Sequence, residues 1–209
     1  MAQADVFIFL DDVQYSKNSY QNRVKIKTPT GPSWLTQSVR KSEGAFRKTN
    51  EVSFSSEQWS ELHLKTIQGN YARSPFFARY FELLQEMFVS QSVLLAETNS
   101  MLIRRIALDL GIRCEFLMSS SLNITTTSTQ RLVDLVSTVG GSEYIYGQGG
   151  IKYQDNDLFT NHGLDCKQVD FHHPIYSQLW GEFIPGLSII DFLMMEGSDC
   201  SKIMSTITV

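Results

Sequence analysis

The chain of 209 residues has only three cysteines, Cys114, Cys166 and Cys200, and no two of them form a CxxC pair. A zinc site built from paired cysteines is therefore not expected, and isolated thiols are typical of a reducing compartment. No apolar run approaches the roughly 20 residues that span a bilayer, and the N-terminus has no secretory signal pattern. These features predict a soluble cytoplasmic protein without a membrane span.

An excess of positive charge is also missing. The chain has 18 Lys and Arg residues against 22 Asp and Glu residues, a net charge of -4. Because nucleic-acid-binding proteins carry a basic surface, this balance argues against such a role. There is no Walker loop, no GxSxG and no HExxH motif. The sequence thus identifies no cofactor and no metal site.

The first quarter of the chain has the patterns of β-structure. Residues 5–10 are a short apolar run ending in two carboxylates, which predicts a buried strand. Residues 23–27 then alternate charged and apolar side chains, and "TPTGP" leads from them into "SWLTQSV". This combination predicts a β-hairpin.

The middle of the chain has helical periodicity. Trp59, His63, Ile67 and Tyr71 are spaced by four, which places them on one face of a helix. Ser74-Pro75 has the pattern of an N-cap followed by proline at the first helical position, so a second helix is predicted from there. A third helix is predicted from about residue 92 to 110, ended by Gly111.

Strands and helices alternate in the last part of the chain. "RCEFLMS", "EYIYG" and "CKQVDFHHP" are strand-like, and capping-box patterns at Thr127–Gln130 and Ser188–Asp191 predict helix starts. The strand–helix–strand order from Cys114 to Tyr146 predicts a parallel pair with a crossover helix. The predicted fold is α/β, a single domain over residues 1–209 with a mostly parallel sheet, an N-terminal β-hairpin and a helical block in the middle.

Asp11 and Asp12 are the first candidates for chemistry. Two adjacent carboxylates at the end of a buried strand repel each other and resist burial. Because ligands bind at strand ends in α/β sheets, one carboxylate is a candidate base or amine ligand. The alternative is that one carboxylate caps a backbone turn while the other faces water.

Further candidates come from "FHHPIYSQ", which contains His173, Tyr176 and Gln178. Periodicity does not separate His172 from His173, and a surface histidine is the alternative. In "YGQGG", Tyr146 precedes Gly147, Gly149 and Gly150, and such a loop either binds an anion or forms a plain turn. Arg23 suits an anionic ligand or faces solvent. His63 is either catalytic or a residue at the edge of the core, and Asp191 is read as a capping-box residue.

The combination of these motifs resembles the WbqC-like protein family of bacteria. The resemblance is carried by "ADVFIFLDDVQYSKNSYQNRVKI" with "WLTQSV", by Trp59, His63 and Tyr71, by "YIYGQGGIKY", and by "HPIYSQLWGEFIPGLSIIDFLMMEG". It implies a role in the biosynthesis of O-antigen or other surface polysaccharide. It also implies an N-acyl or glycine-type aminoacyl transferase acting on a nucleotide-linked amino sugar. A non-catalytic binding or assembly protein of the same pathway is the alternative.

The resemblance also implies a segment that this sequence does not contain. Members of the family usually begin earlier, with a strand carrying His-Gln-Pro and a short helix that leads into the residues seen here as Ala4-Asp5. That strand is expected to lie beside Val6–Leu10, so its absence is expected to expose unpaired backbone groups there.

We therefore predict one pocket lined by Asp11 or Asp12, Arg23, His63, Tyr146 and His173, with residues 147–150 at its rim. The predicted catalytic residues are Asp11, Asp12, His63 and His173. The predicted substrate-binding residues are Tyr15, Asn22, Arg23, Tyr71, Tyr146, Gly147, Gly149, Gly150, Tyr176 and Gln178.

Overall fold

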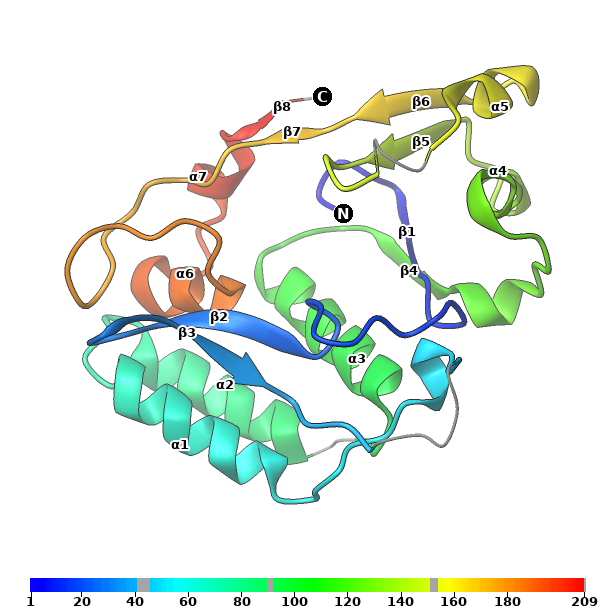
Figure 1. The fold of residues 1–209 in the computed structure, drawn as a ribbon. Coiled ribbons are helices and arrows are strands. Elements are labelled where there is room, and N and C mark those ends of the chain that lie inside the picture. Colours follow the sequence, from blue (N-terminus) through cyan, green and yellow to red (C-terminus); the bar gives the residue numbers. More distant parts are fainter. Residues whose placement is uncertain (41–45, 90–91, 151–153, 209) are drawn as a thin grey trace. The chain divides into compact units, whose positions relative to one another are not determined.

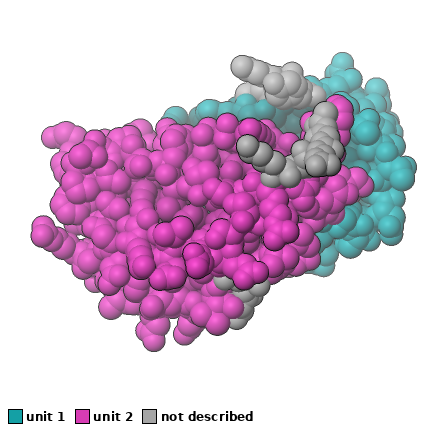
Figure 2. Space-filling model, turned by 60° about the horizontal axis from the view of Figure 1, so that its bottom comes forward, with its two compact units in different colours: residues 1–11, 112–174, 200–209 teal, residues 12–111, 175–199 magenta. Residues whose placement is uncertain are grey.

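The computed structural model describes residues 1–40, 46–89, 92–150 and 154–208. The chain forms two compact units, shown in Figure 2. Unit 1 consists of Met1–Asp11, Ile112–Pro174 and Cys200–Val209, and unit 2 consists of Asp12–Gly111 and Ile175–Asp199. Because both units are built from discontinuous stretches of chain, this division does not test the prediction of a single domain.

Unit 2 contains the predicted hairpin and the predicted helical block (Figure 1). Its elements are β2 (Arg23–Thr28), β3 (Gly31–Thr36), η1 (Thr49–Glu51), α1 (Trp59–Tyr71), α2 (Phe77–Val89), α3 (Leu95–Asp109) and α6 (Ile189–Glu196). Helix α6 packs against both β2 and α2, and α1 packs against α2. Ile26, at the centre of β2, is almost fully buried.

The hairpin follows directly from the sequence pattern. Strands β2 and β3 pair in antiparallel register from Arg23 with Thr36 to Thr28 with Gly31. Gly31 closes the turn with a φ of 111°, which a residue with a Cβ rarely adopts. Because side chains alternate along a strand, Arg23, Lys25 and Lys27 share one face and Val24 and Ile26 share the other.

The helices predicted in the middle of the chain are confirmed, but the start of the second one differs from the prediction. The stripe from Trp59 to Tyr71 forms α1, and α3 ends as expected before Gly111, whose φ is 69°. The prediction of an N-cap at Ser74 is wrong, because α2 begins at Phe77 and the Ser74 hydroxyl donates back to the Tyr71 carbonyl at 2.7 Å. Among the described residues, no helix has the length and apolar character needed to cross a membrane.

Helix α6 begins where the second capping-box pattern placed it. The Ser188 hydroxyl accepts a hydrogen bond from Ile190 N–H at 3.4 Å, as an N-cap does. Asp191 is the last residue of the same capping-box pattern, and its carboxylate accepts hydrogen bonds from two tyrosine hydroxyls. Asp191 is therefore more than a capping residue.

We expect Ser188→Ala to lower the free energy of unfolding by about 1 kcal/mol, because it leaves one helix N–H without its acceptor. Ligand affinity is expected to stay unchanged. Urea unfolding measures the first quantity and titration calorimetry the second. A large loss of affinity at unchanged stability would instead place Ser188 in the binding site.

Unit 1 contains the short parallel strands. Its elements are β1 (Val6–Phe9), β4 (Glu115–Met118), η2 (Ser119–Leu122), α4 (Ser128–Thr138), β5 (Glu143–Tyr146), α5 (Asn156–Asn161), β6 (Asp165–Gln168), β7 (Asp170–Phe171), α7 (Ser201–Met204) and β8 (Ile207–Thr208). The predicted parallel pair of β4 with β5 is wrong. Instead β4 pairs with β1 and β5 pairs with β6, both in parallel, and β7 pairs antiparallel with β8.

Helix α4 packs on this part of the chain through an apolar face. Val133 and Val136 are buried together with Phe159 and Leu164 from α5 and its C-terminal turn. The helix begins after Thr127 as the first capping-box pattern predicts. Thr127 makes no side-chain cap, however, and Gln130 donates to Asp134 one turn later. The helix start was predicted correctly and its capping interaction was not.

A groove in unit 1 separates β1 from β5. It has a volume of about 470 Å³ and is lined by β1, by β5 and by apolar residues of α4 such as Leu132 and Val136. Within the described residues, β1 has a strand partner on one edge and so does β5. Val6 and Ile8 of β1 and Glu143 and Ile145 of β5 are among the residues that line this groove.

Candidate functional site

Two buried amide side chains mark the open end of the β2–β3 hairpin. Gln37 N–H donates to the Asn22 carbonyl at 2.7 Å, and Asn22 Nδ2 donates to the Gln37 carbonyl at 3.0 Å. Both residues are only 8% exposed. Asn22 Oδ1 and Gln37 Oε1 are buried, and neither accepts a hydrogen bond from any residue that the structure describes. Such atoms cost free energy unless a donor reaches them, so they are candidates for contact with a polar ligand.

Two buried donors of unit 2 also have no partner within the described ranges. Arg23 Nε is buried and makes no hydrogen bond within the described ranges, and the same holds for the Tyr15 hydroxyl. Burial raises the pKa of Tyr15, so this hydroxyl keeps its proton. The guanidinium of Arg23 lies 4.1 Å from the centroid of the Trp34 ring. The predicted residues Tyr15, Asn22 and Arg23 thus all have unsatisfied polar atoms.

His63 lies beside Thr36, the residue of β3 that pairs with Arg23. Its Nε2 is 3.3 Å from the carbonyl oxygen of Thr36. Because a carbonyl only accepts, Nε2 carries the proton and Nδ1 is left as an acceptor. Burial lowers the pKa of His63, and the ring packs edge-on against Trp59 at 5.3 Å. His63 is therefore a neutral imidazole near pH 7 with one nitrogen able to take a proton.

Further along β2, Lys27 is fully buried, at 0% exposure. Its ammonium donates to Gln178 Oε1 at 3.1 Å, to the Gly181 carbonyl at 3.4 Å and to the Glu182 carbonyl. Three acceptors satisfy the three donors of a lysine ammonium. Lys27 therefore fixes the segment around residues 178–182 to the hairpin.

A buried carboxylate belongs to the same part of unit 2. Asp191 is also 0% exposed and accepts from Tyr71 at 2.9 Å and from Tyr176 at 2.7 Å. The Tyr71 hydroxyl in turn accepts from the backbone N–H of Lys27 at 2.9 Å. Burial raises the pKa of Asp191, whereas the two tyrosine hydroxyls and the charge of Lys27 lower it. Burial also raises the pKa of both tyrosines, so they remain donors.

This network includes three predicted substrate-binding residues, Tyr71, Tyr176 and Gln178. Their polar groups bind one another and the backbone, since Gln178 also donates to the Ile184 carbonyl at 3.1 Å. Their contact with substrate stays a prediction. Lys27 and Asp191, which the sequence reading did not select, are the charged centres of the network.

The two adjacent carboxylates belong to different units. Asp11 is in unit 1 and is buried, and it accepts from Ser119 Oγ at 3.1 Å, Ser120 N–H at 2.9 Å and Ser120 Oγ at 2.6 Å. It therefore holds the start of η2, as in the alternative reading of a backbone cap. Asp12 is half-buried in unit 2. The catalytic role of both residues stays a prediction.

The remaining predicted residues are in unit 1. Tyr146 stacks on Tyr144 with ring centroids 6.1 Å apart, and Gly147 accepts from Gly150 N–H at 3.0 Å in a turn. A Cβ on Gly150 would lie 3.2 Å from the Tyr146 ring, so the close turn favours glycine. None of Gly147, Gly149 and Gly150 has positive φ.

The two histidines after β7 differ in their contacts. His172 Nε2 is 3.2 Å from Asp170 Oδ2, and His173 is exposed with its ring edge-on to Phe171 at 5.1 Å. His173 therefore has the freer imidazole, and its catalytic role stays a prediction.

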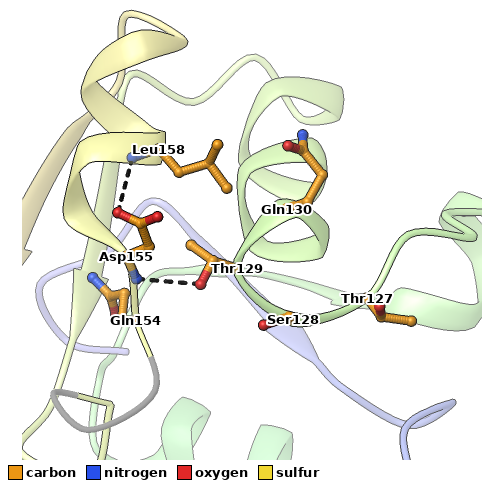
Figure 3. A pocket seen from close by; sticks show the side chains of 7 residues that line it. All are labelled: Thr127, Ser128, Thr129, Gln130, Gln154, Asp155 and Leu158. Atoms are coloured by element: carbon orange, nitrogen blue, oxygen red, sulfur yellow. Dashed lines mark hydrogen bonds between the residues drawn. The ribbon is translucent and has the colours of Figure 1, made fainter.

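A pocket of about 460 Å³ lies where α4 and α5 begin (Figure 3). Asp155 caps α5 by accepting from Asp157 and Leu158 N–H groups, and its own N–H donates to Thr129 Oγ1 at 3.2 Å. Asp155 and Thr129 thus join the two helix starts. None of the predicted site residues lines this pocket.

The structure therefore brings part of the predicted site together. Asn22, Arg23 and His63 lie at one end of the hairpin in unit 2, and the buried Gln37 joins them. Its sequence signal was its place in the strand-like run "SWLTQSV". Tyr146, Gly147, Gly149, Gly150, His173 and Asp11 belong to unit 1. That all these residues line one pocket stays a prediction. Within the described ranges, no cluster of His, Cys, Asp and Glu has the arrangement of a metal site.

Comparison with known proteins supports the resemblance seen in the motifs. The family model of the WbqC-like protein family matches residues 1–203. The uncharacterized protein Rv1507c of Mycobacterium tuberculosis is 29% identical over 201 residues, which are 95% of this chain and 87% of that protein. No solved structure matches the chain.

Proposed function

The chain belongs to the WbqC-like protein family, and from that premise and the hairpin end we propose that it transfers an acyl or aminoacyl group to the amine of a nucleotide-linked amino sugar. Such a transferase would serve the biosynthesis of O-antigen or another surface polysaccharide. The carrying observation is the set of buried polar atoms that have no partner among the described residues, together with a neutral histidine at the same end of the hairpin. The acceptors Asn22 Oδ1 and Gln37 Oε1 suit sugar hydroxyl or amine hydrogens.

The donors suit the other half of such a substrate. Arg23 Nε is buried and has no acceptor among the described residues. A guanidinium binds phosphate oxygens with charge-assisted hydrogen bonds. An acyl acceptor that offers hydroxyls, an amine and a phosphate matches this mixture. A purely apolar ligand would leave all of these atoms unsatisfied.

The chemical step needs a base. The sugar nitrogen forms a bond to the donor's carbonyl carbon, the bond from that carbon to the leaving group breaks, and the leaving group departs with its electron pair. The amine proton passes to Nδ1 of His63, which is free because Nε2 donates to Thr36. The acyl donor is an activated ester or thioester.

The proposed transfer is tested by incubation of the protein with UDP- and dTDP-linked amino sugars plus activated acyl and aminoacyl donors. A mass gain on the sugar is expected. His63→Gln is expected to lower the rate by roughly 10²- to 10⁴-fold, whereas His162→Gln in unit 1 serves as the matched control. Because burial lowers the pKa of His63, the acid limb of the rate profile is expected below the ordinary value of about 6.5.

The proposal fails if no donor produces a mass gain, or if His63→Gln keeps the full rate. One observation favours a second function, a non-catalytic protein that binds the nucleotide sugar in the same pathway. The carboxylate of Asp11, predicted as catalytic, already accepts three hydrogen bonds. Binding of the sugar without any mass gain is the expected result for that second function.

A further inference from the structure

One face of the hairpin carries a cationic and aromatic surface. Arg23, Lys25 and Lys27 share this face, and the register places Trp34 directly opposite Lys25. Lys27 is covered by residues 178–182, but the ammonium of Lys25 lies 5.2 Å from the Trp34 centroid and the guanidinium of Arg23 lies 4.1 Å from it. Two cations therefore lie close to one indole.

A second aromatic side chain extends this surface. Tyr20, in the turn before β2, has its ring centroid 5.8 Å from that of Trp34. Trp34 is 41% exposed and Tyr20 is 68% exposed. Exposed tryptophan and tyrosine beside arginine are the residue types that concentrate binding energy at interfaces.

The two cations lack the usual carboxylate partners. In the part of the chain that the structure describes, neither Arg23 nor Lys25 forms an ion pair, and Nε of Arg23 is buried without an acceptor. A cation on an aromatic face without an anion is poised for an anionic ligand, since the ring holds it in place while its N–H groups stay available.

We propose that Tyr20, Arg23, Lys25 and Trp34 bind the nucleoside diphosphate half of the substrate. The base stacks on the aromatic pair, and the phosphates accept hydrogen bonds from Arg23 and Lys25. A simple anion would leave the exposed rings without a role, and a neutral sugar would leave the two cations unpaired. Because this step assigns one half of a nucleotide-linked sugar, it rests on the proposed function for the whole ligand.

This arrangement predicts tolerance for the base. Stacking uses the face of the ring, which every base has, and it carries little information about the hydrogen-bonding edge. UDP and dTDP are therefore expected to bind with similar affinity. Inorganic pyrophosphate contacts only the cations and is expected to bind much more weakly.

The test titrates the chain with UDP, dTDP and pyrophosphate by calorimetry, with no sugar and no acyl donor present. Trp34→Leu is expected to weaken UDP binding roughly 10-fold or more, and Trp34→Phe to keep part of the affinity because a ring remains. Lys25→Gln is expected to weaken UDP binding and to reduce its salt dependence. Lys65→Gln, an exposed cation on α1 paired with Glu61, is the matched control and is expected to bind like the unchanged chain.

Circular dichroism and thermal melting establish that each variant is folded. The inference is overturned if the unchanged chain does not bind UDP, if pyrophosphate binds as tightly as UDP, or if both Trp34 variants bind UDP normally. UDP binding that depends on Trp34, without any acyl transfer, would overturn the proposed transferase and support this inference. Acyl transfer at an unchanged rate in Trp34→Leu would support the proposed transferase and overturn this inference.

Discussion

A strand added ahead of Met1 is expected to raise the melting temperature of the protein by roughly 5–10 °C and to increase its soluble yield. The groove between β1 and β5 is the reason. Glu115 N–H donates to the Asp5 carbonyl and Asp165 N–H donates to the Ser142 carbonyl. In a parallel ladder, alternate residues direct both backbone groups to the same neighbour.

The direction of the unpaired groups follows from these two bonds. Asp5, Phe7 and Phe9 face β4, so Val6 and Ile8 direct their N–H and C=O groups away from it. By the same rule Glu143 and Ile145 direct theirs away from β6. All four residues line the groove. A parallel strand placed there would join β4, β1, β5 and β6 into one five-stranded sheet, and each added backbone hydrogen bond contributes about 1 kcal/mol.

The added segment needs two parts. A strand of about five residues rich in valine and isoleucine suits a position covered by α4, and a connection of at least a dozen residues is needed before a parallel neighbour. The first strand expected from the family resemblance is one such segment. Its control is the same extension with proline at alternate strand positions, because proline cannot donate to the ladder.

Hydrogen exchange separates strand insertion from a general gain in solubility. The N–H groups of Val6, Ile8, Glu143 and Ile145 are expected to exchange more slowly in the extended protein. The N–H of Phe7 is expected to change little, because the ladder already pairs it with β4. Equal melting temperatures for the extended protein and its proline control, with no new protection, would show that the groove does not accept a strand.

The outcome for β1 illustrates what local sequence patterns can predict. The hairpin and α1 were predicted because alternation and fourfold spacing depend on neighbouring residues. The pairing of β4 with β1 was not predicted, because it joins residues more than a hundred positions apart. A strand-like run carries no local information about its partner, and the order of strands and helices favoured β5 as the partner of β4.

The candidate site also combines residues that local patterns predict with residues whose role depends on distant parts of the chain. Asn22 and Arg23 were predicted because polar residues at a hairpin end and the family motif coincide there. Lys27 was not predicted, because it alternates with Ile26 in the same way as Lys25, which is only half-buried. Its burial depends on residues 178–182, about 150 positions away. Asp191 was assigned to helix capping because its spacing from Ser188 fits a capping box, whereas its carboxylate binds tyrosines from α1 and from the segment before α6.

The buried charges of Lys27 and Asp191 lead to the other large effect. We expect Lys27→Met to lower the free energy of unfolding by about 3–5 kcal/mol, because it leaves the Asp191 carboxylate buried without the nearby positive charge that lowers its pKa. It also removes the donor from three acceptors, Gln178 Oε1 and the carbonyls of Gly181 and Glu182. Lys65→Met, on an exposed helix position, is the control and is expected to stay within about 0.5 kcal/mol.

The effect of pH distinguishes a charge effect from a packing effect. Burial raises the pKa of Asp191, and removing the ammonium raises it further, above the unfolded value. A carboxyl whose folded pKa is raised stabilises the fold below its unfolded pKa and loses that contribution as pH rises through the folded pKa. The loss of stability in Lys27→Met is therefore expected to be smaller at pH 5 than at pH 8 in urea unfolding.

Combining Lys27→Met with Asp191→Asn is expected to remove this pH dependence and to restore part of the stability, because no buried charge remains. A deficit that is equal at both pH values, and unaffected by Asp191→Asn, would mean that Lys27 contributes only through packing and through the loop carbonyls.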